Sequence, residues 1–377
     1  MTNEQLTKIK QETWNLASCI QERSDLVAEI FPAGLDAKQN QNIKFFSTVG
    51  VDVRGGGELF LKVFVGSQWQ AKAEVVNTNI LTINNVDGVV PIIDSESSGE
   101  NTLIVYPHVE GKSFHAVLGQ EITGEVMDKT AKVLKVSSKL EGFQKFQVPE
   151  AFLKQYPFPD SVFASPIFQQ INQAYNPFWR LRNSICEQSP GLSMDRTPRN
   201  IMIAGKDIKQ IDFEMVYQDS PLFDLAKLLR NGPETGVAKS VNMVDVVASP
   251  TEVFEKHNPF KAKDEAELVD RFIETTLGNQ DKPLTTYNYW QVAAHTHIFY
   301  ISKYLRRYNE IQNSQIKENS YQRMAFHFAG LLSLKDKILE PFTGRTEQVK
   351  RLITSGVDKI EVTKLFDLYT ALADQIK

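Results

Sequence analysis

Short apolar runs separated by turn residues mark the first part of the chain, whereas the rest has apolar residues at helical spacing. Strands are predicted at 26–31, 43–49 and 58–65, because β-branched and aromatic residues gather there between clusters that contain Gly or Pro. An antiparallel meander is the simplest arrangement of these three segments.

One helix and two more strands complete the sheet-rich part. Residues 68–84 contain neither Gly nor Pro, which favours a helix, and the apolar runs at 89–93 and 102–106 are typical of strands. The pattern then changes from strands to helices. We therefore predict two domains, 1–107 and 108–377.

Helices are predicted for most of the second domain. Apolar positions recur at helical spacing in 125–140, and the chain beyond residue 232 has a helical pattern. Residues 147–179 are rich in Pro and Phe and give no clear period, so an insertion is one interpretation. The clearest stripe, at i, i+3, i+4 and i+7, consists of Trp290, Ala293, Ala294, His297, Ile301, Tyr304 and Leu305.

Composition excludes several classes of protein. The chain has 42 Lys and Arg against 46 Asp and Glu, and its net charge of −4 gives no general attraction to nucleic acids or anionic membranes. Cys19 and Cys186 stand far apart, without the spacing of a zinc site or a disulfide framework. Neither a signal peptide nor a run of roughly 18 apolar residues is present, so we expect a cytoplasmic protein.

The segment with the most specific chemistry contains Asp195, Asn200 and Asp212. Asp195 precedes Asn200 by five positions, an apolar strand and a turn follow, and a second strand leads to Asp212. Phosphoryl transfer needs such a layout: the first Asp orients the attacking hydroxyl, while the Asn and the second Asp hold Mg²⁺ on the nucleotide phosphates. The hairpin should bring Asn200 and Asp212 together.

At these residues the chain resembles the aminoglycoside phosphotransferase and choline kinase family. The family's loop reads H-G-D-x-x-x-x-N and is followed by an apolar hairpin and I-D-F/W-E. Here the hairpin ends in Ile211-Asp212-Phe213-Glu214, and a further family element appears as Pro221-Leu222-Phe223-Asp224-Leu225-Ala226.

The resemblance implies an α+β, two-lobed protein-kinase-like fold with an antiparallel-sheet N-terminal lobe and a mostly helical C-terminal lobe. It also implies dependence on ATP and Mg²⁺. Asp195 would be the catalytic base, Asn200 and Asp212 the magnesium ligands, and Asp224 a structural residue that caps a helix behind the site. Ser193 and Met194 stand where the family has His and Gly; because that His mainly supports the loop, its replacement concerns rate and rigidity more than chemistry.

A kinase of this type also needs a strand lysine for the phosphates, paired with a carboxylate on a helix. Lys62 lies in an apolar strand and is the candidate, and Glu74, in the predicted helix that follows, is its partner. Glu58 and Lys72 are the alternatives for the two roles. A solvated lysine on an open sheet face is the other interpretation of Lys62.

The run 103–112 resembles the hinge between the lobes of the family, an apolar strand that ends in a Glu-Gly turn. Adenine would then bind backbone groups near Tyr106 and His108. An edge strand that leads into a loop would look similar in sequence.

The acceptor is predicted to be a hydroxyl of a small molecule. A protein kinase would have Gly after Asp212-Phe213 and a longer segment before Asp224. A kinase-like regulator with little or no activity is the other alternative, suggested by Ser193 and Met194. Acidic and basic residues beyond 231 are balanced in number, which gives no acidic funnel for a polycation.

Aromatic residues offer two further hypotheses about the acceptor. A quaternary amine could bind among Tyr287, Tyr289 and Trp290, although such a cluster more often belongs to the core. Trp179 and Arg180, which precede the catalytic loop, are candidates for lining an acceptor pocket.

Overall fold

A computed structural model gives the structure of the protein, and its described part forms two compact units. The first unit comprises residues 1–114, 140–143 and 200–216, and the second comprises 115–139, 144–199 and 217–377. None of the helices in the described part is long and apolar enough to span a membrane. Described residues are 43–51, 57–65, 68–99, 101–114, 157–159, 163–188, 191–194, 197–198, 200–205, 207–231, 241–260, 262–277, 282–340, 359–376 and single positions in 4–14 and 128–143.

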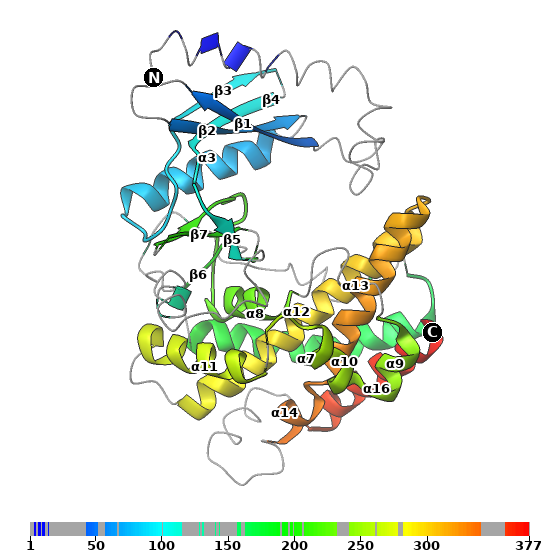
Figure 1. Ribbon diagram of the computed structural model, residues 1–377. Coiled ribbons are helices and arrows are strands. Elements are labelled where there is room, and N and C mark those ends of the chain that lie inside the picture. Colours follow the sequence, from blue (N-terminus) through cyan, green and yellow to red (C-terminus); the bar gives the residue numbers. More distant parts are fainter. Residues whose placement is uncertain are drawn as a thin grey trace. The chain divides into compact units, whose positions relative to one another are not determined.

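A four-stranded antiparallel sheet forms the centre of the first unit (Figure 1). Its order is β1 (Ile43–Val51), β2 (Gly57–Val65), β4 (Asn101–Pro107) and β3 (Asp94–Ser98). The strands predicted at 43–49, 58–65 and 102–106 are therefore confirmed. β1 and β2 pair as antiparallel neighbours, as the predicted meander requires, while its first strand, at 26–31, lies outside the described residues. β4 lies between β2 and β3 because its side chains are almost all buried, as a central strand requires.

The predicted strand at 89–93 is wrong. Within it, Val89 forms an isolated bridge to Gln210, and the amides of Val90 and Ile93 donate to the carbonyls of Gln210 and Val105, but no strand forms. The neighbouring strand is β3, whose sequence Asp-Ser-Glu-Ser-Ser is polar and mostly exposed. An edge strand with both faces near solvent needs no apolar alternation, so sequence patterning misses it.

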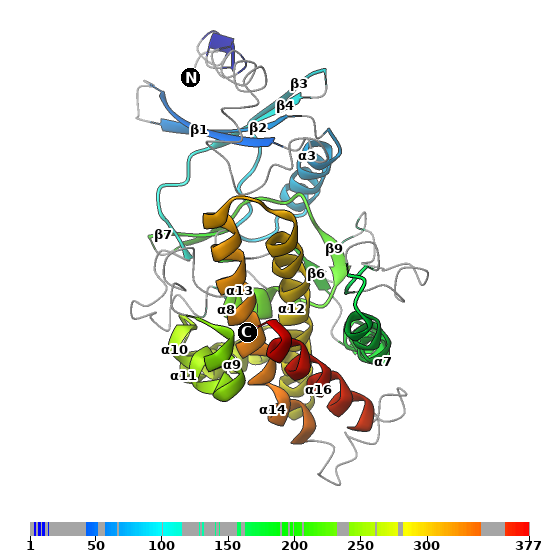
Figure 2. The same cartoon turned by 90° about the vertical axis from the view of Figure 1, so that its right-hand side faces the viewer.

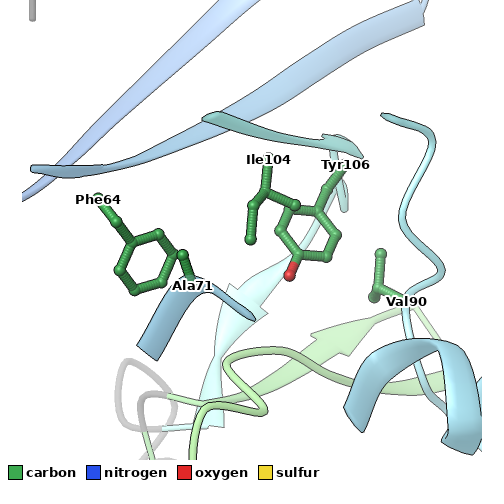
Figure 3. Packing of buried hydrophobic residues seen from close by; sticks show 5 residues of the cluster. All are labelled: Phe64, Ala71, Val90, Ile104 and Tyr106. Carbon is green, nitrogen blue, oxygen red and sulfur yellow. The ribbon is translucent and has the colours of Figure 1, made fainter. Parts of the chain in front are cut away.

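Helix α3 (Gln68–Ile83) confirms the helix predicted from the absence of Gly and Pro, and it packs against the sheet. Figure 3 shows the apolar cluster that joins helix and sheet, in which Phe64 and Ala71 lie close together and Tyr106 and Ile104 project from β4. Val90, beyond the helix, closes the cluster. This packing fixes α3 to strands β2 and β4.

A second, three-stranded sheet in the same unit has the order β5 (Lys112–Ser113), β7 (Ile201–Ala204) and β8 (Asp207–Gln210). The predicted hairpin is thus present as β7 and β8. Gly111 lies so close to β7 that a Cβ atom there would be 2.4 Å from the Ile203 carbonyl oxygen. Glycine is required by this approach of two backbones.

The described residues of the second unit are helical or irregular apart from the short strand pair β6 (Gly191–Ser193) and β9 (Tyr217–Asp219). The helical pattern predicted beyond residue 232 is confirmed for the described residues. The segment 147–179, for which no element was predicted, contains the start of a long helix. The helices are α7 (Pro166–Gln188), α8 (Leu222–Arg230), α9 (Met243–Ala248), α10 (Pro250–His257), α11 (Ala262–Phe272), the π-helix η1 (Ile273–Leu277), α12 (Lys282–Glu310), α13 (Ser314–Leu332), α14 (Lys335–Leu339) and α16 (Lys359–Ile376).

Helix α12 carries the predicted apolar stripe and lies beside α13 in both views (Figures 1 and 2). Most of the stripe is buried, including His297, whose ring would be 2.2 Å from a Cβ atom at Gly330 of α13. The two helices therefore approach closely at a small residue. The strand predicted at 26–31 and most of the helix predicted at 125–140 lie outside the described residues.

Gly111→Ala should destabilise the protein, because the added methyl group would meet a backbone oxygen that cannot rotate away. We expect a loss of about 1–3 kcal/mol in the free energy of unfolding, measured by urea denaturation. Lys112→Ala, at the neighbouring exposed position, should change it by less than about 0.5 kcal/mol. Equal effects of the two substitutions would contradict the close approach of Gly111 to β7.

Candidate active site

Lys62 lies in the middle of β2 and is 2% exposed. Its ammonium Nζ is 2.9 Å from Asp212 Oδ1 and 2.9 Å from Glu214 Oε1, and it also forms an ion pair with Glu74 Oε2. Burial by itself would lower the pKa of Lys62, but the three surrounding carboxylates outweigh it and raise this pKa above its ordinary value. The lysine therefore remains charged, and the interpretation of it as a solvated surface residue is wrong.

Glu74 projects from α3 and is fully buried. One carboxylate oxygen accepts from Lys62 and the other accepts from the hydroxyl of Tyr106. Burial raises the pKa of Glu74 to about 7, and the charge of Asp212 acts in the same direction, whereas Lys62 and Tyr106 oppose the shift. The ion pair expected between a strand lysine and a helix carboxylate is thus present. Lys72, one of the alternatives, is exposed on α3, and the side chain of Glu58 lies outside the described part.

The β7–β8 hairpin brings Asn200 and Asp212 to adjacent chain segments. The amide of Ile211 donates to the carbonyl of Asn200 at 3.0 Å, one residue before Asp212. Asp212 has a φ of 69°, a left-handed conformation that costs energy for a residue with a Cβ atom. Asn77 of α3 donates to the carbonyl of Phe213 at 2.8 Å and so fixes the chain just after this strained residue.

The donor set around Asp212 suits a hard cation. Glu74, Asp212 and Glu214 each offer a carboxylate oxygen, and these oxygens lie within 4.8 Å of one another. When all three carboxylates are ionised, their charge exceeds that of the one ammonium group, and a divalent ion would balance the excess; Mg²⁺ prefers oxygen ligands. Asp212, whose side chain is 32% exposed, is the most accessible of the three. Glu214 was missed as a site residue in the sequence, although it is the last residue of the Ile-Asp-Phe-Glu motif.

Asp224 lies in the second unit and holds the chain just before Asp195. Its carboxylate accepts from the Ser193 hydroxyl at 3.0 Å and from the Met194 amide at 2.7 Å. The prediction that Asp224 caps a helix is wrong: Pro221 occupies the N-cap of α8, and no side chain caps that end. The buried carboxylate instead satisfies two donors of the preceding loop.

The remaining predicted site residues have different outcomes. Asp195 lies outside the described residues, so its role stays a prediction. Tyr106 is buried, with its hydroxyl on Glu74, and His108 lies just beyond the end of β4. The binding of adenine near these two residues also stays a prediction.

Of the residues considered for the acceptor, Tyr287, Tyr289 and Trp179 are buried in the second unit, Trp290 is half-buried and Arg180 is exposed. Tyr289 is fully buried and donates to Glu265 at 2.5 Å. The ring of Trp290 already faces two cations, with Lys337 Nζ 4.0 Å and Arg230 Cζ 5.3 Å from its centroid. Trp179 is buried too and stacks on a guanidinium group, that of Arg182. These contacts leave no aromatic box for a quaternary amine at Trp290.

Comparison with known proteins identifies the fold. Neither a family model nor a curated protein matches the sequence. Among solved structures, the chain is similar to a choline/ethanolamine kinase family protein from Mesorhizobium loti, with 13% identity and a TM-score of 0.50 over 87% of this chain and 97% of that one. The chain has the protein-kinase-like fold.

Two further structures show the same kind of similarity. A choline kinase from Cryptosporidium parvum has 13% identity and a TM-score of 0.49, with 88% of this chain and 99% of that one covered. An amicoumacin kinase in complex with AMP-PNP and Ca²⁺ has 14% identity and a TM-score of 0.48, with 81% and 93% covered. In a kinase-like fold, Lys62 on a strand and Glu74 on the following helix occupy the order expected of the phosphate-binding pair.

Lys62→Met should destabilise the first unit, because two buried carboxylates and the partly exposed Asp212 would lose their counter-charge. We expect a loss of about 3–5 kcal/mol in the free energy of unfolding. The folded-state pKa of Glu74 lies above its ordinary value of 4.5, so protonation stabilises the folded state, and this stabilisation is lost as the pH rises through about 7. Lys62 opposes the rise in this pKa, so in Lys62→Met the Glu74 carboxyl should take up a proton more readily. The loss caused by Lys62→Met should therefore be smaller at about pH 6, where the carboxyl is neutral, than at about pH 8.

Urea denaturation at both pH values measures this effect. Lys72→Met, which changes an exposed lysine ten residues along the chain, is the matched control and should alter stability by less than about 0.5 kcal/mol. If Lys62→Met were as mild as the control, the buried ion-pair network would not be a stabilising element.

Proposed function

We propose that this protein is a phosphotransferase that moves the γ-phosphate of ATP, with Mg²⁺, to a hydroxyl group of a small molecule. The observation that carries the proposal is the position of Lys62, which contacts both Glu74 of α3 and Asp212 of the hairpin. In kinases this lysine binds the nucleotide phosphates, and its glutamate partner and the metal-binding Asp must both be in place. The kinase-like fold agrees with this function.

Each residue then has a defined role in the proposed reaction. Lys62 would hold the nucleotide phosphates, and Glu74 would keep the lysine extended along the sheet. Asp212 and Asn200 would hold Mg²⁺, which neutralises charge on the transferred phosphoryl group, and Glu214 adds negative charge beside them. Asp195 would accept the proton of the acceptor hydroxyl.

A small-molecule acceptor is favoured over a protein by the region after Asp212. Glu214 stands where protein kinases have the Gly of their Asp-Phe-Gly motif. Strand β9 and helix α8 then follow within a few residues, with Asp224 already in the first turn of α8. The interval leaves little chain for an activation segment that binds a peptide.

The direct test is transfer of labelled γ-phosphate from ATP into an extract of small metabolites, resolved by mass spectrometry. A labelled product that is formed by the wild-type protein, and not by Asp195→Asn, would establish a small-molecule kinase and identify the acceptor class. Binding of ATP without any labelled product would favour the kinase-like regulator. Labelling of proteins instead, in a parallel reaction with a protein extract, would contradict the choice of acceptor.

Asp195→Asn and Asp212→Asn should impair different steps, phosphoryl transfer in the first and magnesium-dependent nucleotide binding in the second. Without its base, Asp195→Asn should lose transfer by at least about a hundredfold while its affinity for nucleotide is kept. Asp212→Asn should weaken magnesium-dependent nucleotide binding by roughly tenfold or more, because a charged oxygen ligand is lost. Calorimetric titration of ATP with and without Mg²⁺ separates the two patterns, and full activity of Asp195→Asn would remove it as the base.

Ser193→Ala should slow transfer without changing nucleotide binding. The variant removes the hydroxyl that donates to Asp224, and the loop before Asp195 then loses one of its two described ties to that carboxylate. We expect kcat to fall about five- to tenfold, as for the loss of a hydrogen bond to a charged group, with KM for ATP unchanged. Ser333→Ala, whose hydroxyl donates to a backbone carbonyl elsewhere in the second unit, is the control and should keep kcat.

A further inference from the structure

Tyr106 is joined to the phosphate-binding pair by an unusual contact. Its ring is buried in the cluster between sheet and helix, and its hydroxyl points away from β4 (Figure 3). The hydroxyl donates to Glu74 Oε1 at 2.5 Å, while Glu74 Oε2 forms the ion pair with Lys62. The glutamate is thus held from both sides, by one residue of β4 and one of β2.

The described groups near this hydroxyl favour the donation on balance, although a hydrogen bond with the Thr78 side chain acts to lower the pKa of Tyr106. Burial and the neighbouring Glu74 carboxylate both raise the pKa of Tyr106, so the phenol keeps its proton. Thr78, one turn after Glu74, donates its own hydroxyl to the Glu74 backbone carbonyl at 2.7 Å, which steadies this part of α3. The ring of Phe60, from the neighbouring strand, lies 6.4 Å from that of Tyr106 and limits its movement.

The consequence concerns the position of α3 relative to β4. Glu74 has two carboxylate oxygens, and a rotation of its side chain away from the sheet would break both bonds together. Without the tyrosine hydroxyl, one oxygen in a buried site would have lost its donor, and the carboxylate could turn toward solvent or take up a proton. Lys62 would then be shared between Asp212 and Glu214 alone, displaced from the position set by the helix.

We propose that Tyr106 is a positioning residue, which holds Glu74 by its hydroxyl and thereby keeps Lys62 in place for the nucleotide phosphates. This role rests on the proposed function. It also connects two parts of the nucleotide site, because Tyr106 stands two residues before His108, at the end of the strand where adenine is expected to bind. Phenylalanine would fill nearly the same volume in the core, so the hydroxyl group is what distinguishes tyrosine at this position.

The test is a double-mutant cycle on nucleotide binding, measured by calorimetric titration of ATP with Mg²⁺. Tyr106→Phe should raise the dissociation constant about five- to twentyfold, the effect of losing a hydrogen bond to a charged group. In the background of Glu74→Gln, which keeps the shape of the side chain but removes the charge that pairs with Lys62, the same change should raise it less than about twofold. Tyr287→Phe removes an equally buried hydroxyl in the second unit and should leave binding unchanged.

The outcomes separate this role from its alternatives. An equal effect of Tyr106→Phe in both backgrounds would mean that the tyrosine acts by packing or by touching the nucleotide, and would overturn the proposal. Unchanged binding by Tyr106→Phe would overturn it as well, while the proposed function would stand. Absence of magnesium-dependent ATP binding by the wild-type protein would overturn the proposed function itself, and the positioning role with it.

Discussion

A buried ammonium group surrounded by three carboxylates constrains the first unit more than any other interaction described in it. A lysine in the interior is tolerated only when its charge is balanced, and here the balancing groups come from helix α3 and from the segment after β8. The sheet, the helix and the hairpin must therefore all take their places before Lys62 can be buried. The same arrangement leaves more carboxylates than ammonium groups, which agrees with the proposed binding of a cation.

Asp212 shows how local strain is maintained at this site. Its left-handed backbone is unfavourable for a residue with a side chain, and such conformations persist when the surroundings hold them. The surroundings here are the bond between Ile211 and Asn200, the bond from Asn77 to Phe213 and the ion pair with Lys62. In this backbone conformation the Asp212 carboxylate contacts Lys62, where the nucleotide phosphates are expected to bind.

In the second unit, buried hydrogen bonds hold a loop, the segment at Ser193 and Met194. Asp224 holds Ser193 and Met194, so its carboxylate binds a serine hydroxyl and a backbone amide. Arg182 pairs with Asp219 and stacks on Phe223, 4.2 Å from its ring centroid, which ties α7 to strand β9. Because β9 pairs with β6, these contacts help to set the path of the chain through Ser193 and Met194, just before Asp195, the predicted base.

Apolar periodicity and a few spaced polar residues were enough to predict strands β1, β2 and β4, helix α3, the hairpin and the pair of Lys62 with Glu74. Each of these depends on local patterning or on a motif with fixed spacing. Strand order, the polar edge strand β3, the inclusion of Glu214 and the true role of Asp224 depended on which distant segments meet, and a linear pattern does not contain that information. Tyr106 is the clearest case: its sequence marked a strand, but only tertiary packing placed its hydroxyl on Glu74, because a buried donor must find whichever acceptor the fold brings within reach.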